Sequence, residues 1–461
     1  MTKTIDVGAV LDEGEWSGYQ KLLVFATALT IILDGLDNQI IGVAIPPMMR
    51  EWNLGRPAFA GVLTSGMIGM MVGGFLGGFI GDRLGRRTAL LGSVLVFGVL
   101  TVIISFATSV PMLTVLRFLS GLGLGGAMPN AAAISSEYVP RRQRPFAVTL
   151  TVVCIPLGGS LAGLVGGWVL PAFGWRALFL IAGAVPLILA AVLVKLLPES
   201  PRYMARHRER WPELRAMMRR LGHDVPGDAA FVDATETAVA RASVGELFVP
   251  EFRRDTLALG ASFFFCLLSA YMGTNWVPAM LARSGFDVGT ASYGLTAFNF
   301  GGVVGAIVGA VVIMRLGSRL SMLTMGAGAI AGAIGLTVMS IGPQASVAVF
   351  TMLAWTGGLI NAVQTTMYAL AAHVYPTSIR ATGVGTVVAF GRIGGVVSPT
   401  LGSWALESGG ASRYFGTIAA TMTLVFAALA SVRNHIPRVS LHSSDFSAQT
   451  ADSKVNLKSE I

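Results

Sequence analysis

TIILDGLDNQIIGVAIPP, residues 30–47, has the composition of a helix that crosses a lipid bilayer, with two carboxylates near its middle. An isolated Asp at the centre of such a helix costs roughly 2.5–3.5 kcal/mol on insertion scales. The rest of the chain is equally apolar: 53% of its 461 residues are hydrophobic and 12% are charged, whereas about 25% is usual for a globular domain. We therefore expect a polytopic membrane protein in which Asp34 and Asp37 have a function.

Apolar runs long enough to cross about 30 Å of hydrocarbon occur six times before and six times after a polar stretch. The predicted fold class is an all-α polytopic membrane protein with twelve transmembrane helices in two six-helix pseudo-repeats. The predicted domains are an N-terminal tail (1–21), a first six-helix bundle (22–197), a central loop with one or two surface helices (198–254), a second six-helix bundle (255–433) and a disordered C-terminal tail (434–461).

The two halves of the chain repeat each other. GGFIGDRLGRR (77–87) aligns with GAVVIMRLGSR (309–319), and EYVPRRQRPF (137–146) aligns with HVYPTSIRAT (373–382). A repeat of this kind places a binding site between the halves, near the midplane of the membrane. Arginines are more numerous in the short loops on the side of the two termini, so we expect both termini in the cytoplasm and the chain in the plasma or inner membrane.

Several other classes of function are disfavoured. The net charge of +9 follows from topology, because Arg collects in loops between apolar runs, and it does not indicate nucleic-acid binding. Only His373 lies near a predicted span, and no metal-ligand cluster or nucleophile–base spacing is present, which argues against a membrane enzyme. Neither the central loop (198–254) nor the C-terminal tail looks like a signalling domain, which argues against a sensor. We expect no metal and no cofactor, with protons as the coupling ion.

Ionisable residues inside the predicted spans form a short list: Asp34, Asp37, Arg117 and Arg392. Charges in such places are paired or line a wet cavity. Asp34 and Asp37 are three residues apart and share a helix face, so together they would titrate as a coupled proton carrier with Arg117 nearby. The alternative is a static ion pair with Arg117 and no proton movement. Arg392 is the preferred receptor for an anionic substrate, because its guanidinium suits a carboxylate.

Aromatic and amide side chains in the second half could line the same cavity. Rings together with amides would suit a flat, hydroxylated aromatic ligand. The alternative for each of them is an ordinary aromatic or amide residue facing lipid or the membrane interface. The candidate substrate-binding residues besides Arg392 are Tyr271, Asn275, Trp276, Asn299, Gln364 and Tyr368.

The twelve-span pattern together with GGFIGDRLGRR resembles the major facilitator superfamily, whose loop between its second and third helices carries this motif. The resemblance covers about residues 20–433 and implies a latch on the cytoplasmic side, with Glu137 and Arg144 as expected partners of Asp82. Met314 stands where the second-half copy would have that Asp, so the latch is expected to be asymmetric. The candidate gate residues are Asp82, Arg83, Arg86, Arg87, Glu137, Arg144 and Arg380.

DGLDNQIIGVAIPPM is similar to the signature of the aromatic acid:proton symporters within that superfamily. This resemblance implies transport roles for Asp34, Asp37, Arg117, Glu137 and Arg392, although Leu36 replaces the usual Phe. We expect a monomeric importer that binds a small aromatic carboxylate, similar to hydroxybenzoate or protocatechuate, and moves it by proton symport with rocker-type alternating access. The alternatives are transport of a non-aromatic acid such as lactate or shikimate, and efflux. GSLAGLVGG (159–167) resembles the helix-5 motif of proton-coupled drug exporters, which often carry Pro where this chain has Leu164, and this departure lowers the weight of efflux.

Overall fold

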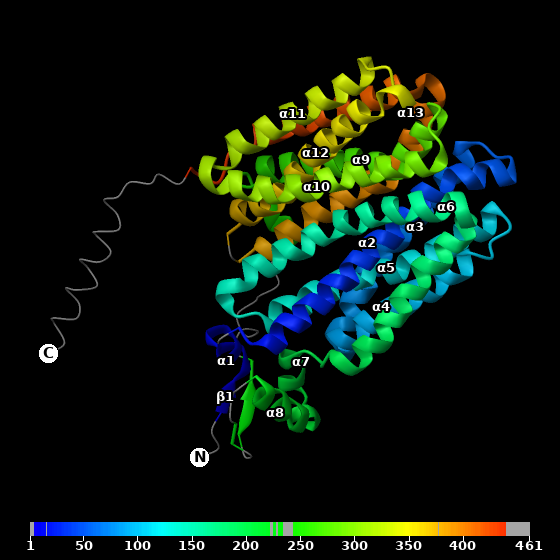
Figure 1. Cartoon of the computed structure of the whole chain (residues 1–461). Coiled ribbons are helices and arrows are strands. Elements are labelled where there is room, and N and C mark those ends of the chain that lie inside the picture. Colours follow the sequence, from blue (N-terminus) through cyan, green and yellow to red (C-terminus); the bar gives the residue numbers. More distant parts are fainter. Residues whose placement is uncertain are drawn as a thin grey trace.

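The computed structural model describes residues 4–438 except 15, 222–224, 227–228, 234–242 and 377. Ten of its helices are long and apolar enough to cross a membrane, and they form two bundles that lie side by side (Figure 1). The first bundle contains α2 (Gly18–Trp52), α3 (Arg56–Leu84), α4 (Arg86–Ile104), α5 (Val110–Tyr138) and α6 (Arg144–Leu196). The second contains α9 (Arg253–Arg283), α10 (Val288–Leu316), α11 (Ser318–Val338), α12 (Ser346–Val374) and α13 (Arg380–Ser431).

Two of these helices are interrupted by glycines. The 53 residues of α6 would extend about 80 Å at 1.5 Å per residue, far more than the ~30 Å of a hydrocarbon core. Gly174 breaks α6 with φ of 73°, a left-handed conformation that a residue without Cβ adopts without strain. α13 is broken at Gly409 and Gly410, and Gly410 has a positive φ of 61°. Each of the two helices therefore contains two segments, which is consistent with the twelve predicted spans and confirms the predicted fold class.

Helix packing follows the repeat between the halves. In the first bundle α3 packs on α5, and in the second α10 packs on α12. A Cβ added at Gly73 would lie 2.1 Å from the carbonyl oxygen of Leu122, and one added at Gly305 would lie 1.9 Å from that of Gly358. The glycine rows are therefore sites of close helix–helix contact, as small-xxx-small spacing predicts.

A small cap covers one end of the first bundle. It contains β1 (Thr4–Asp6), α1 (Val7–Glu13), α7 (Pro201–Arg206), α8 (Trp211–Arg220) and β2 (Ala230–Val232), with short 3₁₀ turns at Arg141–Gln143 and Arg208–Arg210. A further 3₁₀ turn, Val244–Phe248, packs on α9 and α13 of the second bundle. β1 and β2 pair in parallel, with Thr4 opposite Ala230. The cap packs through Val7, Leu11, Leu214, Met218 and Phe231. The sequence predicted surface helices here but not the strand pair, nor the engagement of the N-terminal tail.

The beginning of the predicted C-terminal tail is bound to the second bundle. Asp255 accepts hydrogen bonds from the backbone N–H groups of Arg433 (2.8 Å) and Asn434 (3.2 Å). The Ser318 hydroxyl accepts one from the N–H of Ile436 at 2.8 Å. The expectation of a disordered tail starting at Asn434 is therefore wrong for residues 434–436.

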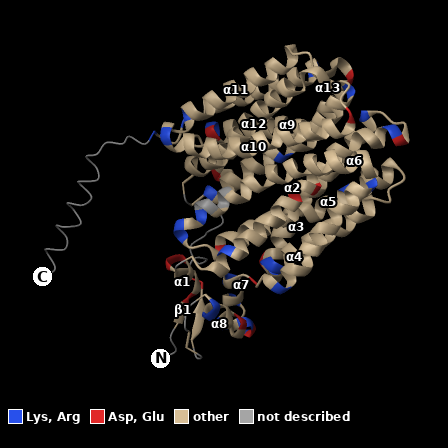
Figure 2. Ribbon diagram, in the orientation of Figure 1, with Lys and Arg blue, Asp and Glu red and all other residues tan. Residues whose placement is uncertain are grey.

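Charged residues are concentrated at the two ends of the bundles, and few lie along their length (Figure 2). The cap and the C-terminal end of α13 lie at the same end of the molecule, and we call this end the near face (Figure 1). We call the opposite end the far face. α2 runs from the near face to the far face, and α3 returns. This distribution is the one expected of helices whose middle parts lie in hydrocarbon.

Candidate substrate and coupling site

The polar residues of α2 lie at the middle of the molecule. Ser17 and Gln20 form a capping box at its near end, and Asn53, with φ of 51°, ends it at the far face. Asp34, Asp37, Asn38 and Gln39 are all at most 6% exposed, so four polar side chains in six residues face protein rather than water. Buried polar groups need partners, and the partners differ from one residue to the next.

Asp37 is held inside the first bundle. Its Oδ1 accepts a hydrogen bond from the Thr101 hydroxyl at 2.6 Å, and its Oδ2 lies 3.5 Å from Nη1 of Arg117. The exposed fraction of the side chain is 0% for Asp37 and 4% for Arg117. The same guanidinium donates to the backbone carbonyl of Asn38 at 3.4 Å. This is the geometry of a buried ion pair that joins α2 to α5, the alternative that the sequence left open.

Asp34 is in a different position. It is 4% exposed, and its Oδ1 is buried without a hydrogen-bond partner. It lines a central cavity of about 200 Å³, whereas Asp37 is not among the lining residues. The two carboxylates, three residues apart on α2, thus have different surroundings: Asp37 has a cationic partner and Asp34 lines the cavity. An unpaired buried carboxylate loses its desolvation penalty when it takes up a proton.

The central cavity lies between the two bundles. Asp34 and Asn38 line it from α2, and Arg392 lines it from α13, together with Gln364 and Tyr368 of α12. Arg392 is half-buried and forms no ion pair or hydrogen bond with another described residue. Its Nη1 would lie only 2.7 Å from a Cβ at Gly74 of α3, so the side chain reaches the first bundle. A carboxyl group and a guanidinium thus line the same cavity from opposite bundles.

Of the predicted substrate-binding residues, some line the central cavity, one lines a smaller pocket beside it, and two line neither. Tyr271, Gln364, Tyr368 and Arg392 line the central cavity. Asn299 lines a smaller neighbouring pocket of about 50 Å³, which shares Asn38, Ile155, Tyr271 and Gln364 with the central one.

Asn275 and Trp276 line neither of these two pockets. Trp276 is 0% exposed and donates its indole N–H to the carbonyl of Pro399 at 3.0 Å, which makes it a core residue of the second bundle. Asn275 is buried, and its backbone carbonyl lies against Gly42 of α2. The expectation that both side chains line the substrate cavity is wrong for this conformation.

The sequence analysis did not identify several lining residues. Asn38 was detectable, because it continues the polar run of α2. Four methionines line the first-bundle side of the cavity, and nothing in their sequence context distinguishes them from other apolar residues of a spanning helix: Met67, Met70, Met71 and Met128. Methionine adapts its shape and makes favourable contacts with aromatic rings.

The near-face residues that the resemblance assigns to a latch are present, but they have other partners. Asp82, near the end of α3, forms an ion pair with Arg86, the first residue of α4, and not with Glu137 or Arg144. Arg144 forms an ion pair with Asp12 of the cap, and Glu137 accepts a hydrogen bond from the Ser200 hydroxyl. The expected pairing of Asp82 with Glu137 and Arg144 is therefore wrong in this conformation.

The remaining predicted gate arginines lie at the same end. Arg83 stacks on the Phe79 ring at 4.2 Å, and Arg380 donates to the carbonyl of Tyr375 at 3.2 Å. The backbone N–H of Arg87 donates to Glu199 at 2.9 Å. Glu199 is 3% exposed and fills the space beside Gly85, where φ is 100°. Sequence analysis did not assign Glu199 a role, although it joins α4 to the cap.

Four hydrogen bonds join the two bundles among the described residues. In each helix that also lines the central cavity, the bonded residue lies nearer the far face than the lining residues do. They are Gln39–Asn299 (2.8 Å), Ser160–Thr296 (3.1 Å), Thr64–Val396 (3.4 Å) and the ion pair Arg56–Glu407 (2.9 Å). In this conformation the bundles are closed over the cavity on the far face.

Comparison with known proteins extends this description. The model of the Major Facilitator Superfamily matches residues 27–399. The 4-hydroxybenzoate transporter PcaK of Pseudomonas putida is 34% identical over 406 residues, 87% of this chain and 89% of that protein. The gallate transporter of the same species is 33% identical over 88% of this chain and 90% of its own length. The crystal structure of a D-xylose–proton symporter covers 91% of this chain and 99% of its own, with a TM-score of 0.64 and 18% identity, and so shares the fold.

Proposed function

The chain belongs to the major facilitator superfamily, and we propose that it imports a small aromatic carboxylate together with protons. The two bundles would expose the central cavity alternately to the two faces by a rocking motion. The near face would be cytoplasmic, and the far face would lie outside the plasma or inner membrane, in accordance with the distribution of arginines in the loops. The acid transporters to which the chain is similar support the substrate class.

The observation that carries this proposal is the pair of opposite charges in one inter-bundle cavity. Arg392 forms no ion pair or hydrogen bond with a carboxylate of the described residues, so it can receive the carboxylate of a substrate. Tyr271, Tyr368 and the methionines give the cavity an apolar wall for a ring. Its volume of about 200 Å³ is below the usual ~300–1,000 Å³ of drug-sized sites, which favours a single-ring molecule.

Asp34 is the residue to which we assign the coupling proton. When the cavity faces outside, Asp34 would take up a proton, and the neutral side chain would cost less to enclose as the bundles close. After release of substrate and proton inside, the charged form would favour reopening of a hydrated cavity. Asp37 and Arg117 would keep α2 in place and compensate each other, with Asp37 in electrostatic contact with the proton site.

The test is uptake into proteoliposomes with and without an inward proton gradient. The panel of radiolabelled acids contains 4-hydroxybenzoate, protocatechuate, gallate, benzoate, vanillate, lactate and shikimate. Accumulation of one or a few aromatic acids only with the gradient is the expected result. Uptake that ignores the gradient would contradict proton coupling, a preference for lactate or shikimate would contradict the aromatic substrate, and gradient-driven loss of preloaded acid would indicate efflux.

A further inference from the structure

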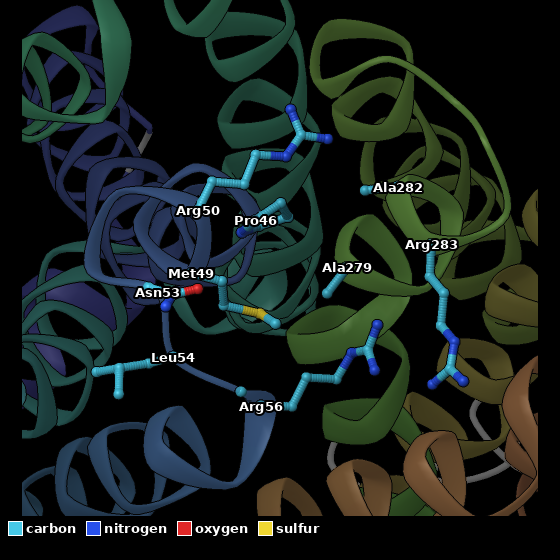
Figure 3. A pocket seen from close by; sticks show the side chains of 10 residues that line it. Pro46, Met49, Arg50, Asn53, Leu54, Arg56, Ala279, Ala282 and Arg283 are labelled. Atoms are coloured by element: carbon cyan, nitrogen blue, oxygen red, sulfur yellow. The ribbon is translucent and has the colours of Figure 1, made fainter.

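A second cavity lies at the far face, above the seam between the two bundles (Figure 3). Its volume is about 490 Å³, and it is lined by the end of α2, the turn into α3 and the end of α9. Three of the ten lining residues are arginines from these three elements: Arg50, Arg56 and Arg283. None of the ten is acidic, and Asn53 is the other polar side chain among them. We call this cavity the far-face pocket.

Arg56 is the buried member of the set. It is 8% exposed, and its Nη1 donates to Glu407 at 2.9 Å. Its Nε is buried and has no hydrogen-bond partner. The N-terminus of α3 at Gly55, directly beside it, has no side-chain cap. A buried N–H without a partner costs about 1–3 kcal/mol, a cost that a bound oxyanion would remove.

The other charges around the pocket leave an excess of positive charge. Arg50 is exposed and has no hydrogen bond or ion pair with a described residue. The neighbouring Glu51 does not neutralise it, because both carboxylate oxygens of Glu51 bind Arg176, at 2.7 and 2.8 Å. Arg283 donates to the backbone carbonyl of Leu406. Among the described residues, Glu407 is the one carboxylate that forms an ion pair with any of these three guanidinium groups.

We propose that the far-face pocket binds a small aromatic carboxylate before it enters the central cavity. The guanidinium groups would bind the carboxylate, and the lining of Pro46, Met49, Leu54 and alanines from α9 would contact the ring. The pocket lies on the seam closed by Arg56 and Glu407, so an anion bound there stands at the entrance that opens in the next step. This assignment rests on the proposed import, because only then does the substrate arrive at this face.

The test compares the initial uptake of the transported acid by the wild type and the Arg50→Gln/Arg283→Gln variant in phosphatidylcholine vesicles. This variant leaves the Arg56–Glu407 ion pair intact. We expect KM to rise at least about threefold with unchanged kcat, because the anion is no longer concentrated at the entrance. The KM of the wild type should also rise with salt between about 0.01 M and 1 M, where the screening length falls from ~30 to ~3 Å, and that of the variant should rise less.

Arg413→Gln is the matched control. Arg413 is also at the far face, but it lies over the Trp404 ring, outside the pocket. The same rise in KM in this control would overturn the proposal, since net charge alone would explain it. An unchanged KM and salt dependence in the double variant would also overturn it. The proposal would also be overturned if the rise in KM were absent in phosphatidylcholine vesicles and appeared only after anionic lipids were added to them. A lipid headgroup would then be the occupant of the pocket.

A binding assay separates this proposal from the proposed function. If the wild type transports no acid of the panel, the proposed function fails, and the pocket is tested with radiolabelled 4-hydroxybenzoate and solubilised Arg392→Gln protein. Binding that persists in this variant and disappears when Arg50→Gln and Arg283→Gln are added supports the far-face pocket. Absence of binding to Arg392→Gln protein, when the wild type binds the acid, would overturn it.

Discussion

Asp34 and Asp37 differ in what surrounds them, and this difference can be tested at the level of the single residue. Asp34 lines the central cavity with an unpartnered oxygen, so Asp34→Asn removes a titrating group without breaking an ion pair. We expect this variant to lose gradient-driven accumulation while its melting temperature in detergent stays within a few degrees of the wild type. Counterflow, which needs no net proton movement, should persist. Full concentrative uptake would contradict the proton role of Asp34.

Asp37→Asn should have a second effect that Asp34→Asn lacks. It leaves the guanidinium of Arg117 buried without its counter-ion, which typically costs about 3–5 kcal/mol. We expect a lower melting temperature together with the loss of accumulation, with protein still present in the membrane. Asp37→Leu/Arg117→Met should recover most of the stability and none of the transport. A double variant whose loss of stability equals the sum of the losses in Asp37→Leu and Arg117→Met alone would show that the pair is not coupled.

Arg392 can be tested through the affinity for substrate. Arg392→Gln removes a charge-assisted hydrogen bond worth about 1.5–3 kcal/mol, so we expect KM or Kd for the transported acid to rise at least about tenfold. Arg392→Lys keeps the charge but not the fork of the guanidinium, and should recover the affinity in part. Affinity unchanged in Arg392→Gln would show that the carboxylate binds elsewhere.

At this scale the sequence predicted which charges are buried but not which of them are paired. Asp34, Asp37, Arg117 and Arg392 are recognisable because charge is costly in a spanning helix. Their partners depend on the rotation of α2 against α4 and α5, which the spacing of three residues does not determine. Trp276 illustrates the same limit, because an aromatic residue that lines a cavity and one that fills a core have the same sequence context.

The packing of individual helices makes a prediction about glycine. Gly73→Ala places a Cβ 2.1 Å from a backbone oxygen of α5, so α3 and α5 must separate. We expect a loss of about 1–3 kcal/mol in the free energy of unfolding, seen as a lower melting temperature. Gly61 lies in the same helix with nothing within 4 Å of an added Cβ. Gly61→Ala should leave stability unchanged or raise it slightly, and an equal loss in both variants would contradict the packing argument.

Helices were predictable from the length of the apolar runs, because the thickness of the bilayer sets that length. The cap was not. β1 and β2 have three residues each and pair across more than two hundred residues of chain, so neither carries a periodic signal of its own. The N-terminal segment is polar and has the composition of a free tail, yet Val7 and Leu11 are fully buried in the core of the cap, where α1 packs on α7.

At the scale of the whole molecule, a cross-link can trap the conformation in which the far face is closed. Arg56 and Glu407 join the bundles at the far face, so Arg56→Cys/Glu407→Cys with a short reducible cross-linker should hold that face closed. We expect uptake to stop on cross-linking and to return on reduction, relative to the untreated double variant. The native Cys154 and Cys266 are buried, which limits background reaction, and each single Cys variant serves as a control. Undiminished uptake by cross-linked protein would contradict alternating access through this seam.

The repeat between the halves predicted that a site lies between them, and the central cavity is there. The sequence could not predict which face is closed. A transporter closes its far face in one state and its near face in the other, and it uses the same residues for both. The sequence therefore does not show to which state a contact such as Gln39–Asn299 belongs. The asymmetry at Met314 is compatible with either state, because the side chain is exposed at the near face.

The hydrogen bonds between the C-terminal segment and the second bundle matter to anyone who attaches a purification tag or a fluorescent reporter to this protein. The helical part of α13 ends at Ser431, and a fusion joined directly after it would look harmless on a hydropathy plot. It would nevertheless displace the backbone groups that Asp255 and Ser318 bind at residues 433–436. A fusion joined after Arg438 keeps them. Residues 433–436 resemble a linker in sequence, but their hydrogen bonds hold this segment against the N-terminal ends of α9 and α11.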